Sequence, residues 1–69
     1  MLEESMKKYI GTHVVLSDCE ISIQDAYSCY DGDFFRVMHV SGKYSGQRED
    51  VNIWTDGGME LTKALPEIQ

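Results

Sequence analysis

Residues 26–40 read AYSCYDGDFFRVMHV, and this stretch decides how the chain folds. Two runs rich in aromatic and β-branched residues flank the pair Asp31-Gly32, and such a pair is the strongest short-range signal for a β-hairpin. Both faces of Phe34–Val40 carry apolar side chains, so we predict that it forms the most buried strand. The segments on either side also alternate, and we expect them to add strands to the edges of this hairpin.

The register of the hairpin depends on the length of its loop. A two-residue loop at positions 31–32 sets Tyr27 opposite Arg36, whereas a three-residue loop at positions 31–33 sets Tyr27 opposite Val37. Because a shift of one residue exchanges the two faces of a strand, these registers expose different side chains. The sequence leaves both registers open.

The chain before the hairpin predicts two strands and a lead-in. Tyr9–Leu16 is the first strand candidate, and Cys19–Gln24 alternates cleanly between apolar and polar residues, as in a strand with one wet face. The polar pair Gln24-Asp25 offers a break before the hairpin. Met1–Lys8 has apolar spacing sufficient for one or two helical turns, so we expect a flexible or short helical lead-in there.

The chain after the hairpin predicts a loop followed by a second hairpin. Ser41–Arg48 contains glycines, serines and cations and is the most loop-like segment. Glu49–Thr55 resumes strand character. Asp56-Gly57-Gly58 then resembles a tight turn, and Met59–Thr62 would return along the preceding strand, with a helical turn to follow before Pro66.

Together these segments predict a mainly β fold, or an α+β fold with one short terminal helix. We expect a small antiparallel sheet or an open barrel of about five short strands. Residues 9–65 form the single small domain in this interpretation, residues 1–8 are the lead-in, and residues 66–69 form a frayed tail.

The charge of the chain narrows the classes of partner. Twelve acidic residues stand against six basic ones, which gives a formal net charge of −6. We expect no direct binding of nucleic acid, because that affinity comes from neutralisation of phosphates by Lys and Arg. A partner protein with a basic surface suits this charge. Solubility alone is the simpler explanation of the acidity.

The length of the chain favours self-association. A single core in a chain of 69 residues rarely supplies more than about 3–5 kcal/mol. Pairing of two copies through a sheet edge would supplement it, so we expect a homo-oligomer. There is no apolar run of the length of a signal peptide or of a membrane span, and two cysteines ten residues apart fit no disulfide framework. We therefore expect a cytoplasmic location without membrane contact.

Aromatic and acidic side chains form the leading candidate site. The chain has four Tyr, two Phe and one Trp, more than a small two-layer fold can bury. Trp54 alternates out of phase with Val51 and Ile53, which predicts an exposed ring; in the alternative interpretation it covers a second small core under the N-terminal segment. Exposed aromatic rings among acids are typical of interface hot spots. The predicted partner-binding residues are Trp54, Tyr27, Tyr30, Asp31, Asp33, Glu49 and Asp50.

The Ser41–Arg48 loop supplies the alternative site. Its glycines free backbone N–H groups to meet an anion, Lys43 and Arg48 supply positive charge, and Tyr44 could stack on a base. This combination favours a small nucleotide as ligand, held by several copies of the loop if the chain oligomerises. A solvated loop without a ligand is the simpler explanation.

Catalysis and metal binding have weaker support. Cys29 or His39 could serve a minimal hydrolase-like enzyme, but there is no G-x-S-x-G motif and little room for a pocket that excludes water. We therefore expect a non-enzymatic protein without a cofactor. The residues available for a Cys2His2 zinc site have spacings that match no zinc finger, so we expect no metal either; they are His13, Cys19, Cys29 and His39.

In size, acidity and β-hairpin content the chain resembles the small accessory proteins that bacteriophages encode against host defences. That resemblance implies two modes of action. Some such proteins block a nuclease by posing as nucleic acid, and others sequester signalling nucleotides. Together with the residues above, it favours an inhibitor or adaptor that acts on a cationic protein.

Overall fold

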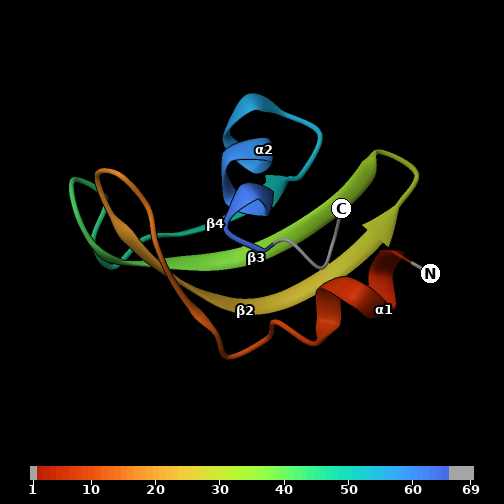
Figure 1. The fold of residues 1–69 in the computed structure, drawn as a ribbon, viewed down its shortest axis with the longest axis horizontal. Helices are drawn as coiled ribbons and strands as arrows, with labels where there is room; N and C mark the ends of the chain where they lie inside the picture. Colours follow the sequence, from red (N-terminus) through yellow and green to blue (C-terminus); the bar gives the residue numbers. More distant parts are fainter. Residues whose placement is uncertain (1, 66–69) are drawn as a thin grey trace.

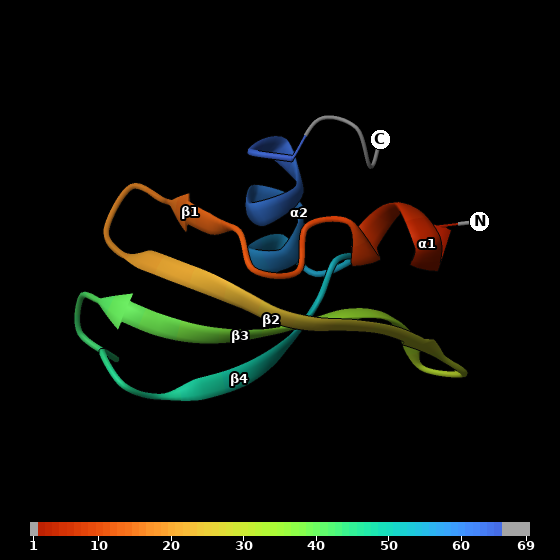
Figure 2. The same ribbon diagram turned by 90° about the horizontal axis from the view of Figure 1, so that it is seen from below.

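The computed structural model describes residues 2–65, and it consists of one antiparallel sheet with both helices on the same face (Figures 1 and 2). The strand order is β1-β2-β3-β4, so each strand pairs with its neighbour in sequence. The predicted class, a small antiparallel sheet with short helical additions, is confirmed, and the sheet is open. The elements are α1 (Leu2–Lys7), β1 (His13–Val15), β2 (Glu20–Cys29), β3 (Gly32–Ser41), β4 (Arg48–Asn52) and α2 (Asp56–Lys63).

The central hairpin is confirmed, but both predicted registers are wrong. Cys29 pairs with Gly32, so the loop consists of residues 30–31, and Tyr27 lies opposite Phe34. Gly32 has a φ of 138°, which a residue with a Cβ rarely adopts, so the glycine closes the hairpin as the first residue of β3. The predicted two-residue loop paired Tyr27 with Arg36, and the structure pairs it with Phe34. Because Phe34 and Arg36 are two positions apart, they lie on the same face of β3, so the face on which Tyr27 lies is unchanged.

Strand β2 is continuous across the expected break at Gln24-Asp25. The register shifts between Ile23 and Asp25, which identifies a β-bulge. Because a bulge adds one residue to one strand, it restarts the alternation of faces. Ile23 and Ala26, three positions apart, are therefore both buried. The polar pair Gln24-Asp25 therefore does not end the strand; it is the place where the alternation of buried and exposed residues shifts by one position.

The N-terminal segment packs into the domain as helix α1. Met6 is fully buried in the core, and the chain turns after the helix through hydrogen bonds from Tyr9 N to Met6 O and from Gly11 N to Ile23 O. This turn occupies the first part of the predicted strand Tyr9–Leu16, so β1 has only three residues. Residues 66–69, predicted as a frayed tail, lie outside the described residues.

The predicted second hairpin at residues 56–58 and the return strand Met59–Thr62 are wrong, because these residues form helix α2. Thr55 caps the helix, and its side-chain oxygen accepts from Gly58 N at 3.2 Å. Leu61 within the helix and Leu65 just beyond its C-cap, Ala64, are both buried in the core. The fourth strand therefore ends the sheet, and a helix returns over the core.

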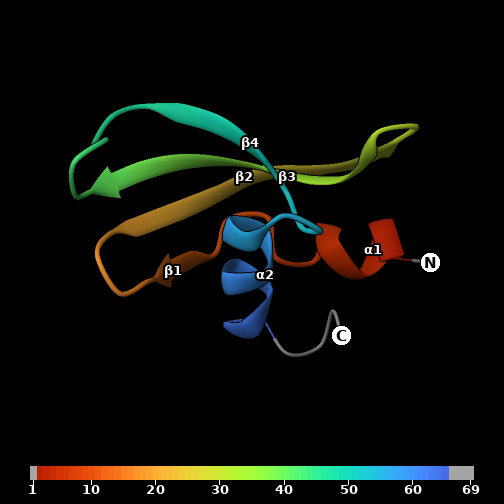
Figure 3. The same cartoon turned by 90° about the horizontal axis from the view of Figure 1, so that it is seen from above.

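The core lies between the sheet and the helices (Figure 3). Phe35, Ile23 and Val37 are the largest buried side chains of the sheet, and they meet Met6 of α1 and Leu61 of α2. Neither helix covers the opposite face, which we call the outer face (Figure 2). Among residues 2–65 there is no helix with the length and apolar character that a membrane crossing requires.

Candidate functional site

The end of the sheet at the β2–β3 turn gathers several of the predicted partner-binding residues. Trp54 follows β4, and its indole Nε1 donates to Asp33 Oδ2 at 3.0 Å. Asn52 Nδ2 donates to the backbone oxygen of Asp31 at 3.3 Å. These two hydrogen bonds connect the segment after β4 to the turn of the hairpin, although 21 positions separate the paired residues.

Two aromatic side chains at this end are exposed to solvent. Tyr30 is 100% exposed at the turn, and Trp54 is 63% exposed. The predicted exposure of Trp54 is confirmed, and the N-terminal segment packs instead through Met6 in the main core. We call Tyr30, Asp31, Asp33 and Trp54 the hairpin-end surface.

Tyr27 and Asp50 belong to a separate cluster on the outer face. Tyr27 Oη donates to Asp50 Oδ2 at 2.6 Å, and Arg36 Nε donates to Asp50 Oδ1 at 3.0 Å. The Tyr27 ring stacks on Phe34 with centroids 5.2 Å apart, and the Arg36 guanidinium lies 5.6 Å from the Tyr27 centroid. The Arg36 hydrogen bond, followed by that of Tyr27, lowers the pKa of Asp50, and the hydrogen bond to this carboxylate raises the pKa of Tyr27. The charge of Asp50 is therefore matched within this cluster.

Glu49 lies apart from both groups and contacts His39. The distance from His39 Nε2 to Glu49 Oε2 is 2.5 Å. His39 is buried, its Nδ1 has no hydrogen-bond partner, and the Tyr44 ring meets it edge-on at 5.8 Å between centroids. The sequence prediction thus joined three places of the fold: the hairpin-end surface, the Asp50 cluster and the Glu49–His39 pair.

The predicted nucleotide loop uses many of its groups internally. Lys43 Nζ lies 5.6 Å from the centroid of Tyr44, and the edge-on contact with His39 further fixes the Tyr44 ring. The amides of residues 45, 46 and 47 donate to backbone oxygens within the loop and at its base. Arg48 begins β4 opposite Met38. These contacts leave fewer free groups for a phosphate and a base than the sequence suggested.

The two candidate catalytic residues lie at opposite ends of the central hairpin, Cys29 at the end of β2 beside the turn and His39 near the far end of β3. Cys29 pairs with Gly32, whereas His39 is seven positions further along, since 39 − 32 = 7. Seven strand residues span about 23 Å, so the thiol and the imidazole do not share a site. Both cysteines are free thiols, and burial is the main cause that raises the pKa of Cys19. Among the described residues, no three His, Cys, Asp or Glu side chains gather as metal ligands.

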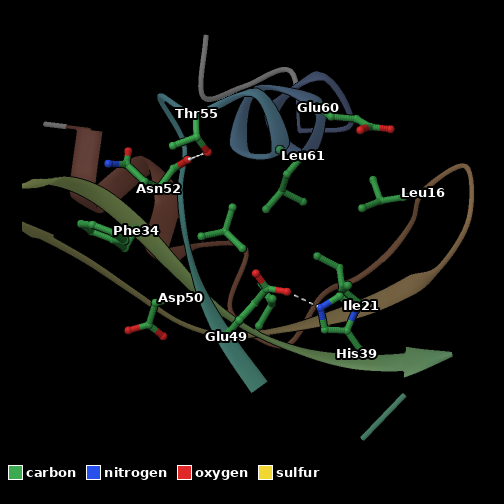
Figure 4. A pocket seen from close by; sticks show the side chains of 13 residues that line it. Leu16, Ile21, Phe34, His39, Glu49, Asp50, Asn52, Thr55, Glu60 and Leu61 are labelled. Atoms are coloured by element: carbon green, nitrogen blue, oxygen red, sulfur yellow. Dashed lines mark hydrogen bonds and ion pairs between the residues drawn. The ribbon is translucent and has the colours of Figure 1, made fainter. Parts of the chain in front are cut away.

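A cavity of about 380 Å³ lies between the sheet and α2 (Figure 4). Its apolar walls include Leu16, Ile21 and Leu61, and the carboxylate of Glu49 projects between them toward His39. Sequence reasoning missed this cavity, because its lining comes from β2, β3, β4, α2 and the β1–β2 connection. A His within the apolar strand 34–40 was the only signal, and it does not by itself indicate a cavity.

Comparison of the chain with protein-family models, with curated proteins and with solved structures finds no match.

Proposed function

We propose that the protein is a non-enzymatic binding module, an inhibitor or adaptor that docks its hairpin-end surface onto a cationic partner protein. The observation that carries the proposal is the exposure of Tyr30 and Trp54 beside two carboxylates, Asp31 and Asp33. Large aromatic side chains supply most of the energy in many interfaces, and acids beside them select a basic counterpart.

The hydrogen bond of Trp54 suits this role. Because the indole N–H already donates to Asp33, a partner that buries the ring leaves no unpaired donor behind. Asp33 also accepts a hydrogen bond from the Ser28 hydroxyl, which fixes the orientation of the carboxylate that binds the indole. An aromatic anchor fixed before binding loses less conformational entropy when a partner covers it.

The charge of the whole chain supports the same partner class. A net charge of −6 steers the approach of a basic surface over a range set by the ionic strength. A protein whose groove binds nucleic acid is basic in this way, and blocking such a groove would be the action of a phage-type anti-defence inhibitor. We place this encounter in the cytoplasm, where free cysteines such as Cys19 and Cys29 remain reduced. Self-association through a sheet edge completes the proposal.

Trp54 fluorescence tests the docking proposal, because the chain has a single Trp. The probe is a nona-arginine peptide, titrated at about 50 and 500 mM salt. We expect a saturable change in emission, with affinity that falls steeply at the higher salt concentration. Replacement of both Asp31 and Asp33 by Asn should weaken binding more than tenfold, since charge-assisted contacts are lost.

Matched variants separate the site from the net charge. Asp18→Asn together with Asp56→Asn removes the same charge from exposed positions outside the hairpin-end surface. This control should lose much less affinity than the Asp31/Asp33 variant. Equal losses in the two variants, or binding that is insensitive to salt, would show that the hairpin end is not the docking surface.

A further inference from the structure

The lining of the cavity between the sheet and α2 combines apolar walls with negative charge. Its 13 residues include Glu49, Asp50 and Glu60 but no Lys or Arg. Asp50 is already paired with Arg36 on the outer face. Glu49 contacts His39, and Glu60 accepts a long hydrogen bond of 3.5 Å from the Ser17 hydroxyl. Neither carboxylate is paired with a Lys or Arg of the described residues, and both line the cavity with the aliphatic side chains of Leu16, Ile21, Val37, Val51 and Leu61.

Glu49 is the polar group that enters the cavity most directly. Figure 4 shows one of its carboxylate oxygens directed at His39 and the other directed into the space between the apolar side chains. An ionised carboxylate only accepts hydrogen bonds, so the contact of 2.5 Å assigns the hydrogen to His39 Nε2. His39 thereby fixes the orientation of the Glu49 carboxylate.

The second ring nitrogen of His39, Nδ1, makes no hydrogen bond. Nδ1 is buried and has no partner, in a residue that is only 9% exposed. Nδ1 is therefore enclosed by protein, and the acceptors that line the cavity are the carboxylates; none of the described lining residues is a Lys or Arg that would compensate their charge.

The side-chain donors around the cavity are already engaged. Thr55 Oγ1 donates to the backbone oxygen of Asn52 at 2.7 Å, and Asn52 Nδ2 donates to the backbone oxygen of Asp31. What the side chains offer a ligand is thus a set of acceptors with negative charge. The complementary group has donors only and a positive charge, which describes an ammonium.

We propose that this cavity binds a small aliphatic ammonium ion, with its nitrogen at Glu49 and its alkyl chain against Val51 and Leu61. The volume of about 380 Å³ lies within the range of small-molecule sites. Apolar walls bury the chain, and the carboxylate supplies a charge-assisted hydrogen bond. This ligand site is independent of the hairpin-end surface.

One feature of the cavity favours the opposite charge. Gly57 lines it near the start of α2, and the first amides of a helix attract anions. Hexanoate is therefore the sharpest comparison for hexylammonium, since the two differ mainly in the charged group. Hexanol, with the same chain and no charge, measures the contribution of the apolar walls alone.

The test is a titration of the full chain with each of the three compounds, followed by amide NMR shifts. Hexylammonium should cause saturable shifts at Val51, Leu61 and Glu49, with an affinity at least about tenfold above that of hexanoate or hexanol. Glu49→Gln should weaken hexylammonium at least about tenfold, since an amide can still accept from His39 but carries no charge. Asp18→Asn, outside the cavity, should bind as the unmodified protein does.

The remaining outcomes decide against the proposal. Binding of hexanoate as tight as that of hexylammonium would assign the cavity to the amides of α2. Unchanged affinity in Glu49→Gln, or no saturable shift with hexylammonium, would also overturn it. If Glu49→Gln unfolds, Glu60→Gln on the exposed side of α2 decides instead, and it should weaken hexylammonium and leave hexanol unchanged.

Discussion

At the scale of one residue, Asp50 on the outer face accepts hydrogen bonds from two neighbouring side chains, Arg36 and Tyr27. Arg36 donates to both carboxylate oxygens, at 3.0 and 3.3 Å, and Tyr27 Oη donates at 2.6 Å. All three contacts favour the ionised form, which is why the pKa of Asp50 lies below its ordinary value. Protonation of Asp50 would loosen the contacts among all three side chains.

This depressed pKa predicts a loss of stability in acid. A carboxyl group with a lower pKa in the folded state adds stability that is complete above its unfolded pKa of 3.8 and is lost as the pH falls through the folded value. Because the pair is solvent-exposed, we expect a contribution below about 1 kcal/mol. A carbonyl-carbon NMR titration should give a pKa below 3.8, raised strongly by Arg36→Gln and less by Tyr27→Phe. An unshifted value in the unmodified protein would contradict this account.

Single residues also show how far the sequence was sufficient. Trp54 is exposed as predicted, but the predicted strand Glu49–Thr55 ends at Asn52, so the turn that follows β4, and not strand alternation, directs the ring to solvent. The partner of Tyr27 was not predictable, since it depends on a register that is fixed only where Gly32 closes the hairpin. Which acids share a surface therefore could not be derived, although the types of residue could.

At the scale of elements, the contact between β4 and α2 depends on one missing side chain. A Cβ at Gly58 would lie 1.9 Å from the backbone oxygen of Asn52 and 2.5 Å from Ile53 Cα. A Cβ at the neighbouring Gly57 would meet nothing within 4 Å. Of these two glycines, only Gly58 is thus required for the close approach of the helix to the end of the strand.

This difference predicts opposite results for two alanine substitutions. Gly58→Ala should lower the free energy of unfolding by about 3 kcal/mol, because the clash is with backbone that cannot rotate away. Gly57→Ala should be neutral or stabilising by up to about 1 kcal/mol, since alanine favours the helix. Urea unfolding followed by circular dichroism measures both. Equal effects in the two variants would mean that Gly58 does not fix the helix against the strand.

The same contact explains why α2 was missed. Asp56-Gly57-Gly58 has the composition of a turn, and the two glycines weaken any local preference for helix. The helix forms because Thr55 caps it and because the core buries Leu61 of the helix and Leu65 just after its C-cap. The burial of these leucines is a tertiary effect, whereas the central hairpin was predicted because its signals are local.

At the scale of the molecule, two candidate sites lie at different places on the sheet. The hairpin-end surface lies at the β2–β3 turn, and the cavity lies under α2 (Figures 1 and 4). The sequence indicated the first by its aromatic and acidic residues but contained no pattern for the second. A cavity lined by strands, a helix and a connection exists only once those elements pack.

We expect any self-association of the chain to depend on its net charge and on the edges of the sheet. Among the described residues, β1 and β4 are the edges of the sheet. Ile53 N donates to Asp33 O and His39 N to Gln47 O, so alternation directs the amides of Arg48 and Asp50 to the open edge of β4. Two copies paired antiparallel through this edge can set Arg48 of each copy opposite Asp50 of the other.

This arrangement predicts that salt has opposite effects on the two kinds of association. Copies that each carry a charge of −6 repel one another, so screening should strengthen self-association. Docking on a polycation should weaken under the same change. The mass from light scattering should therefore rise from that of a 7.9 kDa chain toward twice that value between about 50 and 500 mM salt.

Two substitutions at one position test whether the β4 edge makes this contact. Arg48→Pro removes an amide that points away from β3, so it should abolish the rise in mass while the fold persists. Arg48→Gln removes the same charge but keeps the amide, so dimers should form with reduced affinity. A rise in mass that survives Arg48→Pro would assign self-association to another surface. A mass that falls with salt would mean that attraction between opposite charges, and not backbone pairing against net repulsion, joins the copies.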